Sequence, residues 1–395
     1  MEWTPARIRL FRAAGLCLSQ HEFARAVGFA KRTVGNAERG AHPPSLALRR
    51  ALDDALKRAS DAQRDRFLAA MVADRPATPV VHGATPTIES VELLRRTEAS
   101  DLGTGTLDQL EELVERLGVE YFAVPPAEFR ETVLSWRRYV ARLLEGRLTL
   151  RERRRLYMVA GWLSGLLAEV SLALGDEAET HCVTALSLAQ EVGHAGLAGW
   201  IRGTQAQIAL YAGDPREAVA FARAGRQVAP KGSAAMFRAC VLEARAQARS
   251  GDDVAMEHAF SRAGRVLDAR LEPQTGSFFS FDAPYLPYYA GTAYVWLGKA
   301  TLARAWASQA IELCDADPLA WPVARTSARV DIAIALAQIG ELDGAATAGA
   351  EALDIWARRP THPARRRIEE LLAVLQSFTE PCVTELKERW RWILS

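Results

Sequence analysis

Residues 19–40 read SQHEFARAVGFAKRTVGNAERG. The pattern predicts a helix, a turn at Gly28, a second helix and a stop at Gly40, because glycine tolerates the left-handed backbone of tight turns and helix ends. At about 100° per residue, each helix has one apolar face. Those faces consist of Phe23, Ala24 and Val27 in the first helix and of Ala30, Val34 and Ala37 in the second.

The opposite face of the second helix is polar and basic. Its outward positions are Arg32, Gly35, Asn36 and Arg39, with Lys31 at the flank. A short helix with small apolar residues inside and Arg, Asn and Lys outside fits the major groove of B-DNA. The segment therefore predicts contact with double-stranded DNA.

This segment resembles the phage-repressor-like (Xre) helix-turn-helix family, in which Ser-Gln, a small residue, Gly, Val, Glu and Gly recur at this spacing. The resemblance covers about the first 58 residues. It implies contacts to DNA from one set of residues: Gln20 to phosphate, Lys31, Arg32 and Asn36 to base edges, Thr33 to the backbone, and Arg39 on the same outward face. It also implies that Glu38 is a buried partner for an arginine such as Arg12. The alternative is a degenerate motif that serves only as a packing domain.

The charge of the chain is divided between its parts. The formal net charge is +1 overall, but residues 1–75 hold fourteen Lys or Arg against eight Asp or Glu, a net of +6. The remaining residues hold 35 basic against 40 acidic side chains, a net of −5. A basic head on an acidic body is the distribution expected when one part binds nucleic acid and the other does not.

Composition and motifs exclude several other classes. No stretch approaches the roughly 18 uninterrupted apolar residues of a membrane span, and the N-terminus has no signal-peptide pattern, so a cytoplasmic location without membrane contact is expected. The five cysteines are isolated and predict neither a disulfide framework nor a zinc site. Nucleophile-elbow, dinucleotide and metalloprotease motifs are absent or misplaced. We therefore expect no enzymatic activity, cofactor or metal.

Glycines recur along the rest of the chain at helix ends. They stand at 175, 213, 251, 298 and 340, with separations of 38, 38, 47 and 42 residues. Seven residues before them lie Ala168, Ala206, Ala244, Gly291 and Ala333, and twelve residues after them lie Ser187, Gly225, Ala263, Ala310 and Ala352. Small residues at fixed distances allow two antiparallel helices to approach closely. The spacing resembles that of the tetratricopeptide repeat, which implies stacked helical hairpins with a concave inner surface.

The predicted fold is all-α, a helix-turn-helix domain followed by a tetratricopeptide-like α-solenoid. The expected divisions are a DNA-binding domain over 1–75, a Pro- and Thr-rich linker over 76–105, a helical connector over 106–147, repeats over 148–358 and C-terminal helices over 359–395. Within the connector, Thr106 is expected to cap a helix over 106–117, and a second helix is expected over 127–145.

Candidate ligand-binding residues lie on the first helices of the hairpins and in an aromatic insert. They are Arg202, Gln205, Arg238, Arg245, Tyr289, Arg325 and Arg329, and the arginines are equally consistent with surface charge. The insert over 278–289, FFSFDAPYLPYY, is consistent with a lid, a dimer surface or a loop packed against the next hairpin.

Together these features predict a bacterial transcription regulator. Its layout resembles that of quorum-sensing peptide receptors, which implies a homodimer on an inverted-repeat operator and a peptide or small-molecule effector. The alternative is an adaptor whose repeats recruit a protein while the head is secondary or silent; a hydrolase hidden in the helical body is a remote third.

Overall fold

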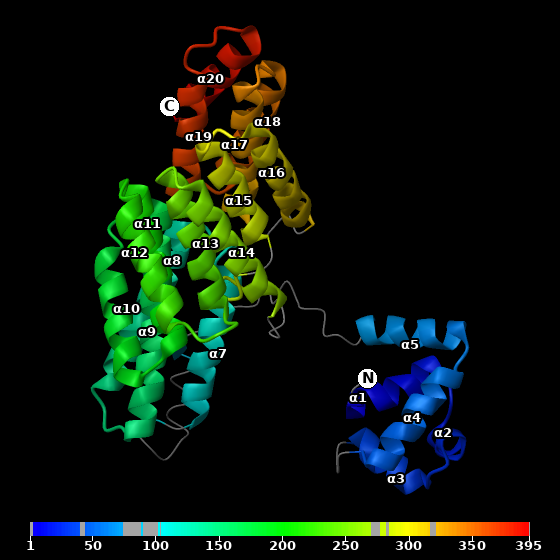
Figure 1. The fold of residues 1–395 in the computed structure, drawn as a ribbon. Coiled ribbons are helices and arrows are strands. Elements are labelled where there is room, and N and C mark those ends of the chain that lie inside the picture. The colour runs from blue at the N-terminus through cyan, green and yellow to red at the C-terminus, as the bar shows by residue number, and fades with distance from the viewer. Residues whose placement is uncertain are drawn as a thin grey trace. The chain divides into compact units, whose positions relative to one another are not determined.

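A computed structural model describes residues 3–39, 44–73, 88–89, 102, 104–269, 277–281, 284–316 and 321–394. These residues form helices and no strand, in agreement with the predicted all-α class (Figure 1). The chain divides into two compact units, Met1–Thr85 and Pro86–Ser395.

The first unit is a small helical domain with its own core. Phe11 is fully buried at its centre and lies 6.0 Å from Phe23 and 5.1 Å from Phe67 between ring centroids. Its elements are α1 (Pro5–Leu10), the π-helical turn η1 (Phe11–Gly15), α2 (Gln20–Val27), α3 (Lys31–Arg39), α4 (Leu46–Arg58) and α5 (Asp61–Ala73).

The boundaries of α2 follow from local chemistry. Ser19 accepts a hydrogen bond from the backbone N–H of Glu22, and the Glu22 carboxylate accepts one from the backbone of Ser19, which completes a capping box. The helix ends at Gly28, whose φ of 75° lies in the left-handed region. The predicted turn at Gly28 is confirmed, whereas the predicted stop at Gly40 lies outside the described residues.

The second unit is a succession of helical hairpins wound into a superhelix (Figure 1). Its helices are α7 (Thr104–Glu120), α8 (Pro126–Leu144), α9 (Leu150–Leu174), α10 (Glu179–Val192), α11 (Ala195–Ala212), α12 (Pro215–Val228), α13 (Ala234–Arg249), α14 (Asp253–Asp268), α15 (Tyr285–Trp296), α16 (Ala300–Asp315), α17 (Pro322–Gln338), α18 (Leu342–Arg358), α19 (His362–Val374) and α20 (Pro381–Leu394).

The repeated glycines act as predicted. All five have positive φ, between 68° at Gly298 and 89° at Gly213, and each lies at the end of the first helix of a hairpin. The small residues seven positions earlier are buried at the helix crossings. At Gly291 a Cβ atom would lie 3.3 Å from Ala307, so this crossing has little room for a side chain.

The first hairpin departs from the predicted spacing. Ser187 was expected at a crossing but is exposed, and Ala189 is buried instead. The reason is the turn: α10 begins four residues after Gly175, whereas α12 begins two residues after Gly213. The two extra residues shift the buried register of α10 by two positions.

Two further expectations need correction. Helix α7 begins at Thr104, so Thr106 is a buried residue within its first turn rather than the cap of a helix over 106–117. Helix α9 is long and apolar enough to cross a membrane, although no such stretch was expected. Because 83% of its apolar window is buried inside the unit, its composition is accounted for by its place in the core.

Segments far apart in the chain meet inside the second unit. Arg359, after α18, donates from Nη2 to the carbonyl oxygen of Tyr121, 2.6 Å away, and His362 of α19 packs against Gly175. These contacts join the last repeats to α7 and α9. These contacts bridge the predicted concave inner surface.

Candidate functional site

The outward face of α3 carries the basic residues predicted to contact DNA. Lys31, Arg32 and Thr33 are exposed in its first turn. In the part of the chain that the structure describes, the side chains of Lys31 and Arg32 make no hydrogen bond or ion pair. Their positive charges are therefore open to an external partner.

The other end of this face is pre-arranged by Arg39. Its Nη2 donates to Oδ1 of Asn36 at 2.7 Å, and its guanidinium covers Gly35, where a Cβ would lie 3.3 Å from Nη1. Gly35 was expected to point outward but is buried under this side chain. The Asn36 oxygen accepts this hydrogen bond, while its amide nitrogen makes none with the described residues.

A buried carboxylate fixes α3 to the preceding helices. Glu38 is 3% exposed; its Oε1 accepts from Nε of Arg12 at 2.6 Å, and its Oε2 accepts from Nε2 of Gln20 at 2.5 Å. Arg9 also donates to the backbone carbonyl of Glu38. The predicted Arg12–Glu38 pair is confirmed. Gln20, predicted to contact phosphate, has its amide nitrogen engaged with Glu38, which makes it part of the support for α3.

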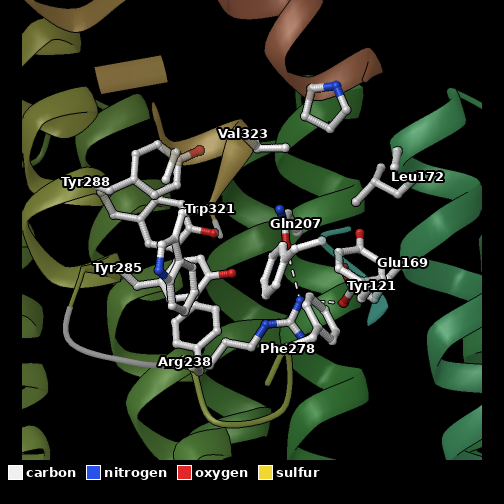
Figure 2. Close-up of a pocket in the computed structure, with 16 residues that line it drawn as sticks. Tyr121, Glu169, Leu172, Gln207, Arg238, Phe278, Tyr285, Tyr288, Trp321 and Val323 are labelled. Carbon is white, nitrogen blue, oxygen red and sulfur yellow. Dashed lines mark hydrogen bonds and ion pairs between the residues drawn. The ribbon is translucent and has the colours of Figure 1, made fainter. Parts of the chain in front are cut away.

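The interior of the second unit holds a buried ion pair. Arg238 of α13 is 1% exposed and donates from Nη2 to Oε1 of Glu169 on α9, 2.5 Å away. Thr204 donates to the same carboxylate oxygen at 2.6 Å. Gln207 accepts from Arg238 at 3.1 Å (Figure 2). The Arg238 guanidinium also lies 4.4 Å from the Trp200 ring, a cation–π contact. Arg238 Nε is buried with no hydrogen-bond acceptor among the described residues.

A cavity of about 60 Å³ lies beside this pair. Aromatic side chains from several helices surround it, and Figure 2 shows Tyr285, Tyr288 and Trp321 facing Tyr121 and Glu169 across it. Burial raises the pKa of Tyr288 to about 12, so its phenol remains neutral near pH 7. The cavity therefore offers aromatic faces, neutral hydroxyl groups and one ion pair.

The aromatic insert supplies much of this lining. Phe278, Phe281, Tyr285 and Tyr289 are buried, and the backbone N–H of Phe278 donates to the carbonyl of Gly118 on α7 at 2.9 Å. A Cβ on Gly118 would lie 2.5 Å from Oγ of Ser277. The insert thus packs across the interior of the superhelix, a wider contact than the predicted packing on the next hairpin alone.

Among the predicted ligand residues, Arg238 and Tyr289 line the cavity and Arg245 lies close to them. Arg245 is fully buried, with its guanidinium 5.0 Å from the Tyr289 ring. Its Nη1 donates to the hydroxyl of Tyr211 at 3.4 Å.

The remaining predicted residues tie helices together. Arg325 and Arg329 of α17 pair with Asp315 at 2.8 and 2.6 Å, and Arg329 also pairs with Glu351 of α18 at 2.9 Å. Arg202 donates to Gln205 at 2.9 Å, and neither lines the cavity. These contacts within the protein explain the positions of the four side chains, so no ligand is needed to account for them.

Sequence reasoning missed Glu169, the counter-ion of Arg238. A lone carboxylate within the apolar stretch LSGLLAEVSLAL of α9 was the available signal, because a charged residue on an otherwise buried helix needs an oppositely charged partner. The aromatic lining from Tyr121 had no comparable local signal.

Comparisons with known proteins add little to this geometry. No protein-family model matches the sequence, and no curated protein matches it. Among the solved structures that match, one is described as a Rap protein complexed with competence and sporulation factor. It has a TM-score of 0.45 and 12% identity, and the match covers 89% of this chain and 97% of that chain. A similarity this remote supports no inference about what the present chain binds.

Proposed function

We propose that the protein is a cytoplasmic, sequence-specific DNA-binding transcription regulator. The observation that carries the proposal is the outward face of α3. Among the described residues, exposed Lys31 and Arg32 have no hydrogen-bond or ion-pair partner, and the Asn36 amide donor makes no hydrogen bond. Arg and Lys recognise guanine and Asn recognises adenine in the major groove, each at about 1–3 kcal/mol of discrimination.

The support behind this face favours the same function. The Glu38 carboxylate holds Arg12 and Gln20 on the inner side of α3, so that the outer residues project from a fixed helix. A rigidly held recognition element loses less conformational entropy on binding than a mobile one. The net charge of +6 over residues 1–75 adds a general attraction to phosphate.

We further propose that the second unit senses an effector and forms the homodimer. The aromatic cavity beside Arg238 and Glu169 is the site that we assign to the effector. Its volume of about 60 Å³ favours a small molecule, or one side chain of a peptide, over an extended peptide. A homodimer would place two α3 helices on half-sites about 34 Å apart, one helical turn of DNA.

The test is a mobility-shift titration of the full-length protein with duplexes from the region upstream of its own coding sequence. Arg32→Ala and Asn36→Ala are expected to reduce the preference for the specific duplex over a scrambled one, by about tenfold or more for the lost base contact. Gln20→Ala is expected to weaken both duplexes together, because it acts through Glu38.

Arg58→Ala is the matched control. Arg58 is exposed in the same unit but lies at the end of α4, so its loss removes one positive charge without changing α3. Equal preference in wild type, Arg32→Ala and Asn36→Ala would contradict the proposal. Absence of DNA binding combined with capture of a specific protein by the repeats would favour the adaptor function instead.

A further inference from the structure

Three guanidinium groups surround one tryptophan at the junction of α13, α15 and α19. Those of Arg245, Arg249 and Arg367 lie 5.1, 5.2 and 5.6 Å from the ring centroid of Trp296. The indole Nε1 donates to Oε2 of Glu370 at 3.0 Å, which fixes the ring. The electron-rich face of the ring attracts each guanidinium, but the three positive charges also repel one another.

A cavity of about 60 Å³ lies at this junction, separate from the aromatic cavity beside Arg238. A buried water needs roughly 10–15 Å³ of such space, so the cavity has room for several waters or for one small polar group. Its lining consists of Leu210, Tyr211, Gly213, Arg249, Trp296, Arg366, Arg367 and Glu370.

The acidic groups that contact this cluster are already committed. Arg367 forms ion pairs with both Asp331 and Glu370, and Thr292 donates to the other oxygen of Asp331 at 2.8 Å. The cluster therefore has four guanidinium groups, those of Arg245, Arg249, Arg366 and Arg367. The two carboxylates beside it both pair with Arg367.

The other three arginines lack an acidic partner in the described part of the chain. Arg245 is fully buried, and its Nε and Nη2 have no hydrogen-bond acceptor there. Arg249 and Arg366 are exposed at the cavity and form no ion pair or side-chain hydrogen bond with the described residues. A buried guanidinium with two unsatisfied nitrogens is costly, and the charge of a nearby anion would lower that cost.

We infer that this cavity binds an oxyanion, the carboxylate or phosphate group of a small ligand. Arg249 and Arg366 would contact the anion directly, because planar guanidinium groups bind both kinds of oxyanion through paired N–H donors. Arg245 does not line the cavity, but its guanidinium lies 5.1 Å from the Trp296 ring centroid and adds positive potential there. The bound anion would join α13 to α19, and this inference does not depend on DNA binding by the first unit.

Isothermal titration calorimetry on the full-length protein tests the site, with inorganic phosphate and succinate as separate probes and chloride at equal ionic strength as the reference. At least one probe is expected to bind, and the tighter one identifies phosphate or carboxylate as the recognised group. Arg249→Gln and Arg366→Gln are expected to weaken binding by about tenfold each, the value of one charge-assisted hydrogen bond.

Two further variants separate recognition from general charge. Arg265→Gln removes an exposed arginine of α14 outside the cavity and is expected to leave binding unchanged. Glu370→Gln removes the carboxylate that faces the anion and is expected to tighten binding. The inference is overturned if neither probe binds better than chloride, or if Arg249→Gln, Arg366→Gln and Arg265→Gln all bind like the wild type.

Discussion

Arginine has opposite roles in the two units of this chain. On α3, Arg32 is exposed and makes no hydrogen bond or ion pair with the described residues, whereas Arg238 in the second unit is 1% exposed and pairs with Glu169. The exposed Arg32 loses little solvation free energy and leaves its positive charge available to an external partner. The buried Arg238 needs a buried carboxylate to offset desolvation and gives the interior a fixed structure. Burial and partner, rather than residue type, decide which role an arginine has.

The largest expected effect comes from breaking the buried pair. Arg238→Met leaves the Glu169 carboxylate in the interior without its cation, and we expect the free energy of unfolding of the second unit to fall by about 3–5 kcal/mol. Urea denaturation followed by circular dichroism measures it. The double variant Arg238→Met/Glu169→Leu is expected to regain most of the loss, because it removes both charges. Similar losses in the single and double variants would contradict this account of the pair.

The corresponding change in the first unit is smaller. Glu38→Ala removes the acceptor of Arg12 and Gln20, and we expect a loss of about 1–3 kcal/mol in the stability of this unit together with weaker DNA binding. The exposed pair of Lys57 and Asp54 provides the control, since Asp54→Ala should change stability by less than about 1 kcal/mol. If Glu38→Ala lowered stability without affecting DNA binding, the orientation of α3 would not depend on this carboxylate.

The sequence predicted the features that depend on short separations. The turn at Gly28 and the Arg12–Glu38 pair follow from a compact motif whose spacing constrains its own geometry. The glycine-terminated hairpins were predicted for the same reason, because a helix end and a close crossing require small residues at fixed distances. Ser187 shows the weakness of that method: two extra residues in one turn shifted the buried face of α10.

The interior of the second unit depends on contacts that no local pattern encodes. Phe278 bonds to Gly118, and Arg359 bonds to Tyr121, across most of the repeat array. The summed rotation of many hairpins decides which distant segments approach one another. A small error in each turn changes that sum. The predicted ligand residues were therefore dispersed: Arg238 and Tyr289 line the aromatic cavity, Arg245 lies near it, Arg325 and Arg329 pair with Asp315, and Arg202 bonds to Gln205.

A smaller effect concerns pH and the N-terminus of α11. His194 caps this helix, with Nδ1 accepting from the backbone N–H of Leu197 at 2.9 Å, and burial lowers its pKa below the ordinary 6.5. The folded state therefore takes up a proton less readily than the unfolded state. This contribution to stability is complete above pH 6.5 and is lost as the pH falls through the lowered pKa.

The variant His194→Asn keeps a capping acceptor but cannot titrate. We expect stability within about 1 kcal/mol of the wild type near pH 7.5 and a shallower decline between pH 6.5 and 5, measured by thermal unfolding. Burial also lowers the pKa of His181 and His362, so part of the decline should remain. His258→Asn, at an exposed position of α14, is the control and should retain the wild-type profile. An unchanged profile for His194→Asn would show that protonation of His194 contributes nothing measurable.

The salt dependence of DNA affinity tests the central claim most directly. Full-length wild type, Arg32→Ala of α3 and Arg223→Ala of α12, whose side chain pairs with Glu243, would be titrated onto one upstream duplex over a range of salt concentrations. If α3 is the DNA-contacting surface, the affinity of Arg32→Ala should fall at every salt concentration. Its slope of log affinity against log salt should become shallower, by at most about 0.9, because the lost charge also lowers the positive potential at the nearby phosphates. Arg223→Ala should reproduce the wild-type line. A slope and an affinity unchanged in Arg32→Ala, or altered equally in both variants, would contradict the assignment of α3 as the surface that binds DNA.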